Sequence, residues 1–326
     1  MDWNSIREQF PITKHCTYFD IANASVFPLT VSNALHEFID QYKLGCIDKQ
    51  KWLDAVHETR KRFGQLINAD YEEICFTKNT SEGLNIAANG IPFKPGENVL
   101  LKNDEHPNNT YCWLNLKSKD VEVRWMPSKN GQVSITDLEK SIDNKTRAIS
   151  LSLVTYMPGN RNDIAAISKI CRQKDIYLVV DATQAMGSIN VDVRELGIDM
   201  LASAGNKALL APHGTGVFYC RKEIFEMIKP TFIARSGMHV PPADLKHDRT
   251  TDLTDFVDNA TRYEYGNLNY MGTYALNEGL KLINSVGIGR IEERIIELSG
   301  YLTDELCKLG VNVLSPFEKQ YRSGIV

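Results

Sequence analysis

Short apolar runs that do not alternate with polar residues recur along the first two thirds of the chain. They cover residues 98–101, 148–154, 176–180, 200–202 and 217–220. A strand reads as a continuous apolar run when both of its faces are buried, which is typical of a mostly parallel sheet covered by helices. These runs therefore predict the strands of such a sheet.

Between and around the runs, apolar residues recur at helical spacing. One stripe is Val31, Leu35, Phe38, Ile39 and Tyr42, a second is Trp52, Val56, Phe63 and Leu66, and a third is Ile164, Ile167, Ile170 and Cys171. We interpret them as the core-facing sides of helices. Strands that alternate with helices predict an α/β fold.

From about residue 274 the pattern changes to long helices interrupted at Gly287 and Gly289, followed by a strand at 311–314 and the start of another at 325–326. We expect a connecting helix that leads into a smaller α+β domain. The predicted organisation is an N-terminal segment over 1–19, a large α/β domain over 20–270, and a linker helix with the start of an incomplete small domain over 271–326.

Composition narrows the class of protein. The 326 residues carry a formal net charge of −4 and no long run of Lys or Arg, so we expect no nucleic-acid partner. The seven cysteines show neither CxxC pairing nor the spacing of a metal site, which favours reduced thiols in the cytoplasm. No segment reads as an export signal or a membrane span, so we expect no membrane association.

Two residues are the main candidates for chemistry. Asp181 follows the run 176–180 and would lie at the carboxyl end of a strand, where open α/β sheets bind ligands. Lys207 comes shortly after the run 200–202. An amine and a carboxylate on neighbouring elements are what pyridoxal 5'-phosphate requires, because the amine holds its aldehyde and the carboxylate keeps its ring nitrogen protonated. Taken singly, Asp181 could cap a turn and Lys207 could be a surface lysine.

Two further segments could contribute to such a site. Thr80 and Ser81 precede a helix-like stretch and would offer hydroxyls and backbone N–H groups to a phosphate, although ordinary helix capping explains them equally. His106 follows the run 98–101 and could stack on a planar cofactor, whereas the alternative is a loop histidine bonded to backbone.

These segments, in this order, resemble the class V aminotransferases, the superfamily that includes cysteine desulfurases, selenocysteine lyases and isopenicillin N epimerase-like proteins. The resemblance extends from Tyr18-Phe19-Asp20 through the segment 262–269. It implies the fold-type I architecture of pyridoxal phosphate enzymes, a small amino-acid substrate, and a homodimer with shared active sites.

The resemblance also implies a role for each residue. Lys207 would form the imine with the cofactor, Asp181 would pair with the ring nitrogen, Gln184 would bond the ring hydroxyl, His106 would stack on the ring, Thr80 and Ser81 would hold the phosphate, and Asn267 would approach the phosphate in the neighbouring subunit.

The chain departs from the family pattern at several positions. Asn206 stands where the desulfurase branch has His, Ala204 where a phosphate-binding Ser is usual, and Asn267 where Thr is usual. Ser203 is adjacent to Ala204, but neighbouring strand residues point to opposite faces. We therefore expect an altered phosphate cup with lower cofactor affinity. In the family, a substrate-binding arginine and the desulfurase cysteine loop come later in the chain, so both would lie beyond Val326.

The main hypothesis is a pyridoxal phosphate-dependent enzyme that acts on the amino group or Cα of a small amino acid, as an aminotransferase. Cysteine desulfurase or C–S lyase chemistry and epimerisation branch from the same first proton transfer and stay open. A non-catalytic family member that serves as a binding or dimerisation module is a separate alternative. A nicotinamide enzyme is set aside, because no GxGxxG turn follows the first strand.

Overall fold

The computed structural model describes residues 2–239 and 255–326, and within them seven strands form a single sheet. Their order across the sheet is β1 (Ile74–Thr77), β7 (Gly216–Cys220), β6 (Met200–Ala204), β5 (Tyr177–Asp181), β4 (Thr146–Ser152), β2 (Asn98–Lys102) and β3 (Glu122–Met126). Strand β7 is antiparallel to β1 and β6, whereas the other neighbouring pairs are parallel. The predicted mostly parallel sheet is confirmed.

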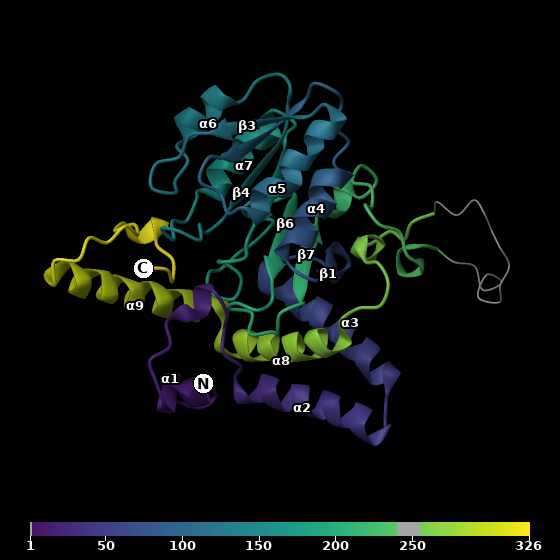
Figure 1. Ribbon diagram of the computed structural model, residues 1–326, viewed down its shortest axis with the longest axis vertical. Helices are drawn as coiled ribbons and strands as arrows, with labels where there is room; N and C mark the ends of the chain where they lie inside the picture. Colours follow the sequence, from purple (N-terminus) through teal and green to yellow (C-terminus); the bar gives the residue numbers. More distant parts are fainter. Residues whose placement is uncertain (1, 240–254) are drawn as a thin grey trace.

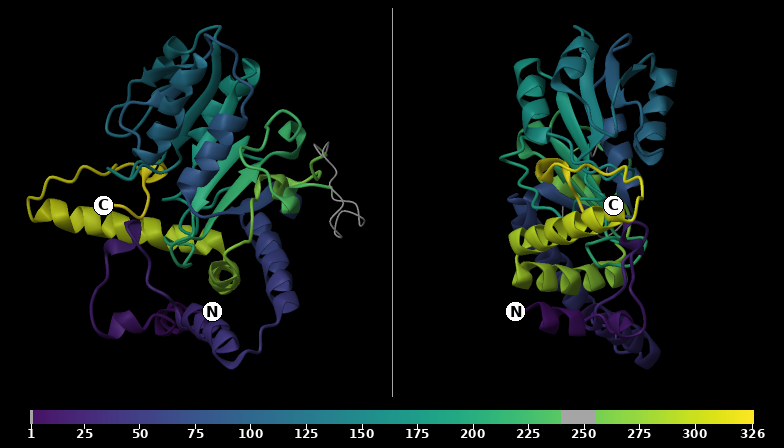
Figure 2. Two further views of the ribbon diagram at one scale, coloured as in Figure 1. Left: turned by 45° about the vertical axis from the view of Figure 1, so that its right-hand side comes forward. Right: turned by 90° about the vertical axis from the view of Figure 1, so that its left-hand side faces the viewer.

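Helices lie on both faces of this sheet (Figures 1 and 2). The α-helices of the described residues are α1 (Trp3–Glu8), α2 (Leu29–Leu44), α3 (Lys49–Ile67), α4 (Thr80–Gly90), α5 (Asn108–Leu114), α6 (Ile135–Ser141), α7 (Ile164–Gln173), α8 (Tyr270–Val286) and α9 (Ile288–Lys308), of which α1 and α2 lie away from the sheet. Side chains of α3, α6, α7 and α8 build the core on one face, and side chains of α4 and α5 build the core on the other. The layered α/β architecture follows from this two-sided burial.

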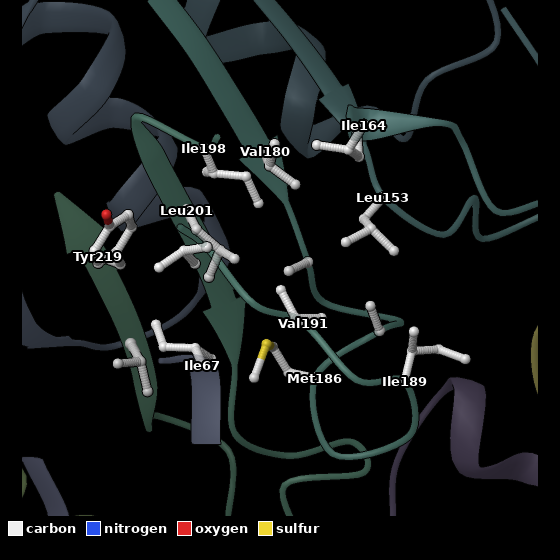
Figure 3. Close-up of a cluster of buried hydrophobic side chains, with 14 of the residues drawn as sticks. Ile67, Leu153, Ile164, Val180, Met186, Ile189, Val191, Ile198, Leu201 and Tyr219 are labelled. Atoms are coloured by element: carbon white, nitrogen blue, oxygen red, sulfur yellow. The ribbon is translucent and has the colours of Figure 1, made fainter. Parts of the chain in front are cut away.

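Strand β5 shows why the apolar runs are continuous. Leu178 and Val180 belong to the first core, and Tyr177 and Val179 belong to the second, so successive residues are buried on opposite faces. Figure 3 shows part of the first core, where Val180 meets Leu153 and Ile198. Because both faces are covered, β5 has no solvent-facing position before Asp181.

Strand β3 was not predicted because it lies at the sheet edge. It contains Glu122 and Arg124, and Trp125 is exposed, so no continuous apolar run marks it. The stripe on α2 was assigned correctly to a helix, but its orientation was partly wrong, since Ile39 and Tyr42 are 52% and 57% exposed. Helix α2 packs against α8, and this contact covers only the side that carries Val31 and Phe38.

The C-terminal part differs from the prediction. Residues 311–314 and 325–326 form no strand, so those two predictions are wrong. Helix α8 crosses the molecule beneath the sheet in Figure 1 and packs against α2 and α3. Of the two predicted breaks, only Gly287 separates helices, because Gly289 lies within α9.

None of the helices in residues 2–239 and 255–326 has the length and apolar character needed to cross a lipid bilayer.

Candidate active site

A pocket of about 270 Å³ lies at the carboxyl ends of β4, β5 and β6. Six of the seven predicted site residues line it, namely Thr80, Ser81, His106, Asp181, Gln184 and Lys207. The carboxyl ends of parallel strands meet at one edge of a sheet, which is why motifs far apart in the sequence converge there. The pocket is therefore the candidate active site.

Asp181 is the last residue of β5 and forms part of the pocket floor. Its side chain accepts a hydrogen bond from the backbone N–H of Thr183 at 2.9 Å. Burial raises the pKa of this carboxyl to about 6, although hydrogen bonds from Thr183 and the charge of Lys207 both act to lower it. A buried carboxylate without a full counter-charge is typical of a functional site.

Lys207 enters the pocket from the connection between β6 and β7. Its amine donates a hydrogen bond to the backbone carbonyl of Ala22. Burial lowers the pKa of the lysine, and the charges of Asp181 and Asp20 oppose that shift. The neutral amine, which is the reactive form, is therefore more accessible here than on a surface lysine.

The turns that carry Asp181 and Lys207 touch each other. Gly187 has a positive φ of +83°, and a Cβ at this position would lie 2.3 Å from the carbonyl oxygen of Ala208. Only glycine allows the two backbones to come this close. This close contact fixes how the backbone segments that follow β5 and β6 lie against each other.

Residues 22–25 close one side of the pocket, which the sequence did not predict. The backbone carbonyl of Ala22 also accepts a hydrogen bond from Nε2 of Gln184 at 3.0 Å. Nδ2 of Asn206 donates to the carbonyl of Asn23 at 3.3 Å, and the backbone N–H of Ser25 donates to the carbonyl of Asn206 at 2.8 Å. These contacts place Asn23 in the pocket lining.

The N-terminus of α4 points its first residues at the pocket. Asn79 is the N-cap, and its side chain accepts a hydrogen bond from the backbone N–H of Glu82 at 3.0 Å. Because Asn79 caps the helix, the hydroxyls of Thr80 and Ser81 are not needed as caps. Thr80 Oγ1 lies 2.5 Å from Thr183 Oγ1. Backbone N–H groups at a helix start favour an anion such as phosphate.

His106 stands in the turn before α5 and is half-buried. Its Nδ1 accepts a hydrogen bond from the backbone N–H of Asn108 at 3.1 Å, so the ring proton of the neutral imidazole is on Nε2. Burial and the charge of Lys207 both lower its pKa. The ring of Tyr156 meets His106 edge to face, with centroids 5.1 Å apart.

Several lining residues were not predicted, among them Ser152, Tyr156, Thr183 and Asn108. Ser152 could have been predicted from its position, because it ends β4 just as Asp181 ends β5. Neighbouring parallel strands end at the same edge of the sheet, so both residues belong to the same site. Tyr156 follows a few residues later. No local pattern marks Asn108 or Asn23.

Asn267 is exposed and is not among the residues that line the pocket. Its expected role toward a neighbouring subunit stays a prediction. Ala204 and Asn206 do line the pocket, so two of the three positions that depart from the family pattern face the candidate site. Ser203 is fully buried, and its hydroxyl donates to the carbonyl of Ala204 at 3.4 Å.

The structure is that of an α/β protein with a pocket at the carboxyl ends of its parallel strands, and comparison with known proteins gives the family. The model of the class-V aminotransferase family matches residues 17–326, so the chain belongs to that family, whose members are pyridoxal phosphate-dependent and act on amino-acid substrates.

Three similar proteins illustrate its range. An uncharacterised aminotransferase of Schizosaccharomyces pombe is 31% identical over 98% of this chain and 82% of its own length. A probable cysteine desulfurase of Methanothermobacter thermautotrophicus is 30% identical over 92% and 74%, respectively. The structure of a cysteine desulfurase of Thermococcus onnurineus, determined in the apo form, superposes with a TM-score of 0.88 at 28% identity, covering 99% of this chain and 81% of that one.

Proposed function

We propose that this chain binds pyridoxal 5'-phosphate on Lys207 and acts on the amino group or Cα of a small amino acid. The observation that carries the proposal is the pairing of a half-buried amine of lowered pKa with a buried carboxylate in one pocket. Family membership supports the same cofactor. When bound, the cofactor draws electron density from the substrate Cα.

The groups that line the pocket fit this cofactor. Lys207 would hold its aldehyde, and Asp181 would face its ring nitrogen. The N-terminus of α4 with Thr80 and Ser81 would receive its phosphate, since a helix start and two hydroxyls suit a dianion. His106 would cover the ring, and Gln184 would bond the ring hydroxyl.

The proton chemistry follows from the pKa values of the lining residues. The substrate's amino group would replace Lys207 on the aldehyde, which frees the lysine amine. That amine would then accept a proton from the substrate Cα, because its lowered pKa makes the neutral form available. Asp181 would hold a proton at the ring nitrogen. His106 keeps a proton on Nε2 as a neutral imidazole, so it can donate a hydrogen bond to the substrate without adding a positive charge.

A cysteine desulfurase or C–S lyase is the second candidate, since several similar proteins are probable cysteine desulfurases. None of the seven cysteines is among the residues found to line the pocket in the described part of the chain. Cys112 lies near Asp181, but burial raises its pKa to about 12, so it is a neutral thiol. Sulfide release from cysteine, measured against keto-acid release from a panel of amino acids, separates the two reactions.

We also propose a homodimer. Apolar side chains on α2 and the turn after it are exposed, including Leu29, Ile39, Tyr42, Leu44 and Ile47. A second copy of the chain would bury them, and Asn267 is available at the surface to reach the partner's pocket. Sedimentation analysis of the wild type and of Ile39→Lys tests this proposal, and a monomeric wild type would contradict it.

Absorption spectroscopy tests the central proposal. We expect the purified chain to give a visible band with added pyridoxal phosphate, and borohydride to abolish that band. Lys207→Ala should lose it, whereas the exposed control Lys145→Ala should retain it. The absence of any band in the wild type at saturating cofactor would favour the non-catalytic binding module. The missing hydroxyl at Ala204 favours that alternative too.

A further inference from the structure

A buried ion pair lies behind the pocket, and the chemistry proposed above does not use it. The side chains of Lys102 and Glu105 are 0% and 1% exposed, and Nζ lies 3.3 Å from Oε1. Lys102 also pairs with Asp104, which is half-exposed. Burying such charges costs more than their attraction returns unless further hydrogen bonds satisfy them.

The second oxygen of Glu105 makes those bonds. Oε2 accepts from Nδ2 of Asn109 at 2.6 Å and from the hydroxyl of Ser152 at 2.7 Å. Asn109 is itself fixed, because its Oδ1 accepts from Ser150 at 2.7 Å and from Trp113 at 3.3 Å. The carboxylate of Glu105 is therefore held between β2, α5 and β4.

Ser152 connects this carboxylate to the pocket. It is paired in register with Asp181 across β4 and β5, and both residues line the pocket. A serine hydroxyl has one hydrogen, and here Glu105 receives it. Toward the pocket, Ser152 can therefore only accept a hydrogen bond. Asp181 and Ser152 therefore both present hydrogen-bond acceptors to the pocket. The carboxylate of Glu105 lies behind Ser152, with its charge partly offset by Lys102.

We propose that Glu105 is a positioning residue for the pocket floor. Its carboxylate accepts the hydroxyl hydrogen of Ser152, so Ser152 can only accept a hydrogen bond from a ligand. Its negative charge also favours a proton beside Asp181. Together these effects favour a ring with a protonated nitrogen over a ring with CH at that position. This inference rests on the proposed function for the identity of that ring. The acceptor geometry and the charge arrangement belong to the chain itself.

The other groups that face Asp181 are consistent with this role. The charge of Glu105 raises the pKa of Asp181, whereas Lys207, from the connection after β6, lowers it. Cys112, from α5, is a neutral thiol, and His106 has a lowered pKa. Glu105 is thus the one negative charge among these groups that strengthens proton binding at Asp181.

The charge effect is measured without cofactor. In the apo protein labelled with ¹³C at the aspartate carboxyls, and assigned with Asp181→Asn, we expect Asp181 to titrate near 6. Burial is the main cause of the raised pKa and persists in Glu105→Gln, so there the midpoint should fall below that of the wild type without returning to 3.8. The exposed control Glu122→Gln should leave it unchanged. A purely structural Glu105 would alter stability only, so an unchanged midpoint in a folded Glu105→Gln protein overturns the inference.

Ser152→Ala provides a second test that retains Glu105. The probes are pyridoxal phosphate and its analogue with CH in place of the ring nitrogen. We expect wild type to prefer the nitrogen-containing ring, and Ser152→Ala to reduce that preference by about 2–10-fold, the effect of one hydrogen bond. An unchanged preference overturns the role of Ser152. If wild type binds neither probe, the proposed function fails, while the apo titration still decides the role of Glu105.

Discussion

Two buried carboxylates, one beside β1 and one at the end of β5, differ in how their negative charges are neutralised. Glu264, beside β1, is 4% exposed, and Asp181, at the end of β5, is 6% exposed. Oε1 of Glu264 accepts hydrogen bonds from Arg60 at 2.9 Å and from the backbone N–H of Phe76 at 2.8 Å. The hydrogen bonds to Asp181 come from Thr183 alone among the described residues, and its pKa is raised to about 6.

The difference separates a structural charge from a functional one. The protein neutralises Glu264 with its own arginine, so that region is complete without a ligand. Asp181 has no arginine or lysine in an ion pair with it among the described residues, and it borders an open pocket. Burying its charge lowers the stability of the folded protein, which is typical of a ligand-binding site.

The largest expected effect is on stability at Glu264. Glu264→Ala leaves the buried Arg60 unpaired and should lower the free energy of unfolding by about 3–5 kcal/mol. Urea denaturation measures it, with Glu223→Ala as the control because Glu223 is an exposed partner of Arg221. A loss no larger than that of the control would remove the structural half of the comparison.

The next effect is on activity at Asp181. Asp181→Asn keeps the shape of the side chain but removes the charge that would face the ring nitrogen, so we expect turnover of a competent amino-acid substrate to fall by about 10²–10³-fold. The exposed Asp175→Asn serves as the control. Near-normal turnover in Asp181→Asn would place the chemistry elsewhere.

The same substitution should have the opposite effect on stability. The folded-state pKa of Asp181 is raised from 3.8 to about 6, so the folded chain binds this proton more tightly than the unfolded chain. The contribution of Asp181 to the free energy of unfolding is fully present below pH 4 and is lost as the pH rises through 6. The total loss is up to about 3 kcal/mol. Apo Asp181→Asn should therefore be the more stable protein at pH 8, with an advantage that shrinks as pH falls from 6 to 4. Equal unfolding free energies of the wild type and Asp181→Asn at pH 8 would show that the charge of Asp181 does not destabilise the folded protein.

The smallest effect concerns the aromatic contact at the pocket. The edge-to-face contact of Tyr156 with His106 is worth about 0.5–1.5 kcal/mol, so Tyr156→Ala should reduce kcat/KM by about 2–10-fold. Tyr156→Phe retains the ring and should behave as wild type. If Phe proves as damaging as Ala, the hydroxyl and not the ring carries the function of Tyr156.

Burial on both faces made most of the sheet predictable from sequence, although the short β1, which is also buried on both faces, was not predicted. Strands β2, β4, β5, β6 and β7 each carry a continuous apolar run, whereas β3 is one-sided at the edge and gives no such signal. The direction in which α2 faces could not be predicted, because Ile39 and Tyr42 fit the helical stripe although both side chains are more than half exposed in the described part of the chain.

The candidate site was predictable where a residue follows a recognisable strand. Asp181 and Lys207 were found in this way, and the same reasoning applies to Ser152. Asn23 could not be found, since its place in the pocket depends on hydrogen bonds such as that from Asn206, which is remote in sequence. Glu105 directly precedes His106, but its role could not be predicted, because it depends on contacts with β4 that local sequence does not show.

The most direct test of the account is to locate the bound cofactor in the chain. The protein is incubated with pyridoxal phosphate, reduced with borohydride, digested, and analysed by peptide mass spectrometry. The account predicts one stoichiometric adduct on Lys207, retained in Asp175→Asn. An adduct spread over surface lysines, or a protein that remains unmodified, would contradict it.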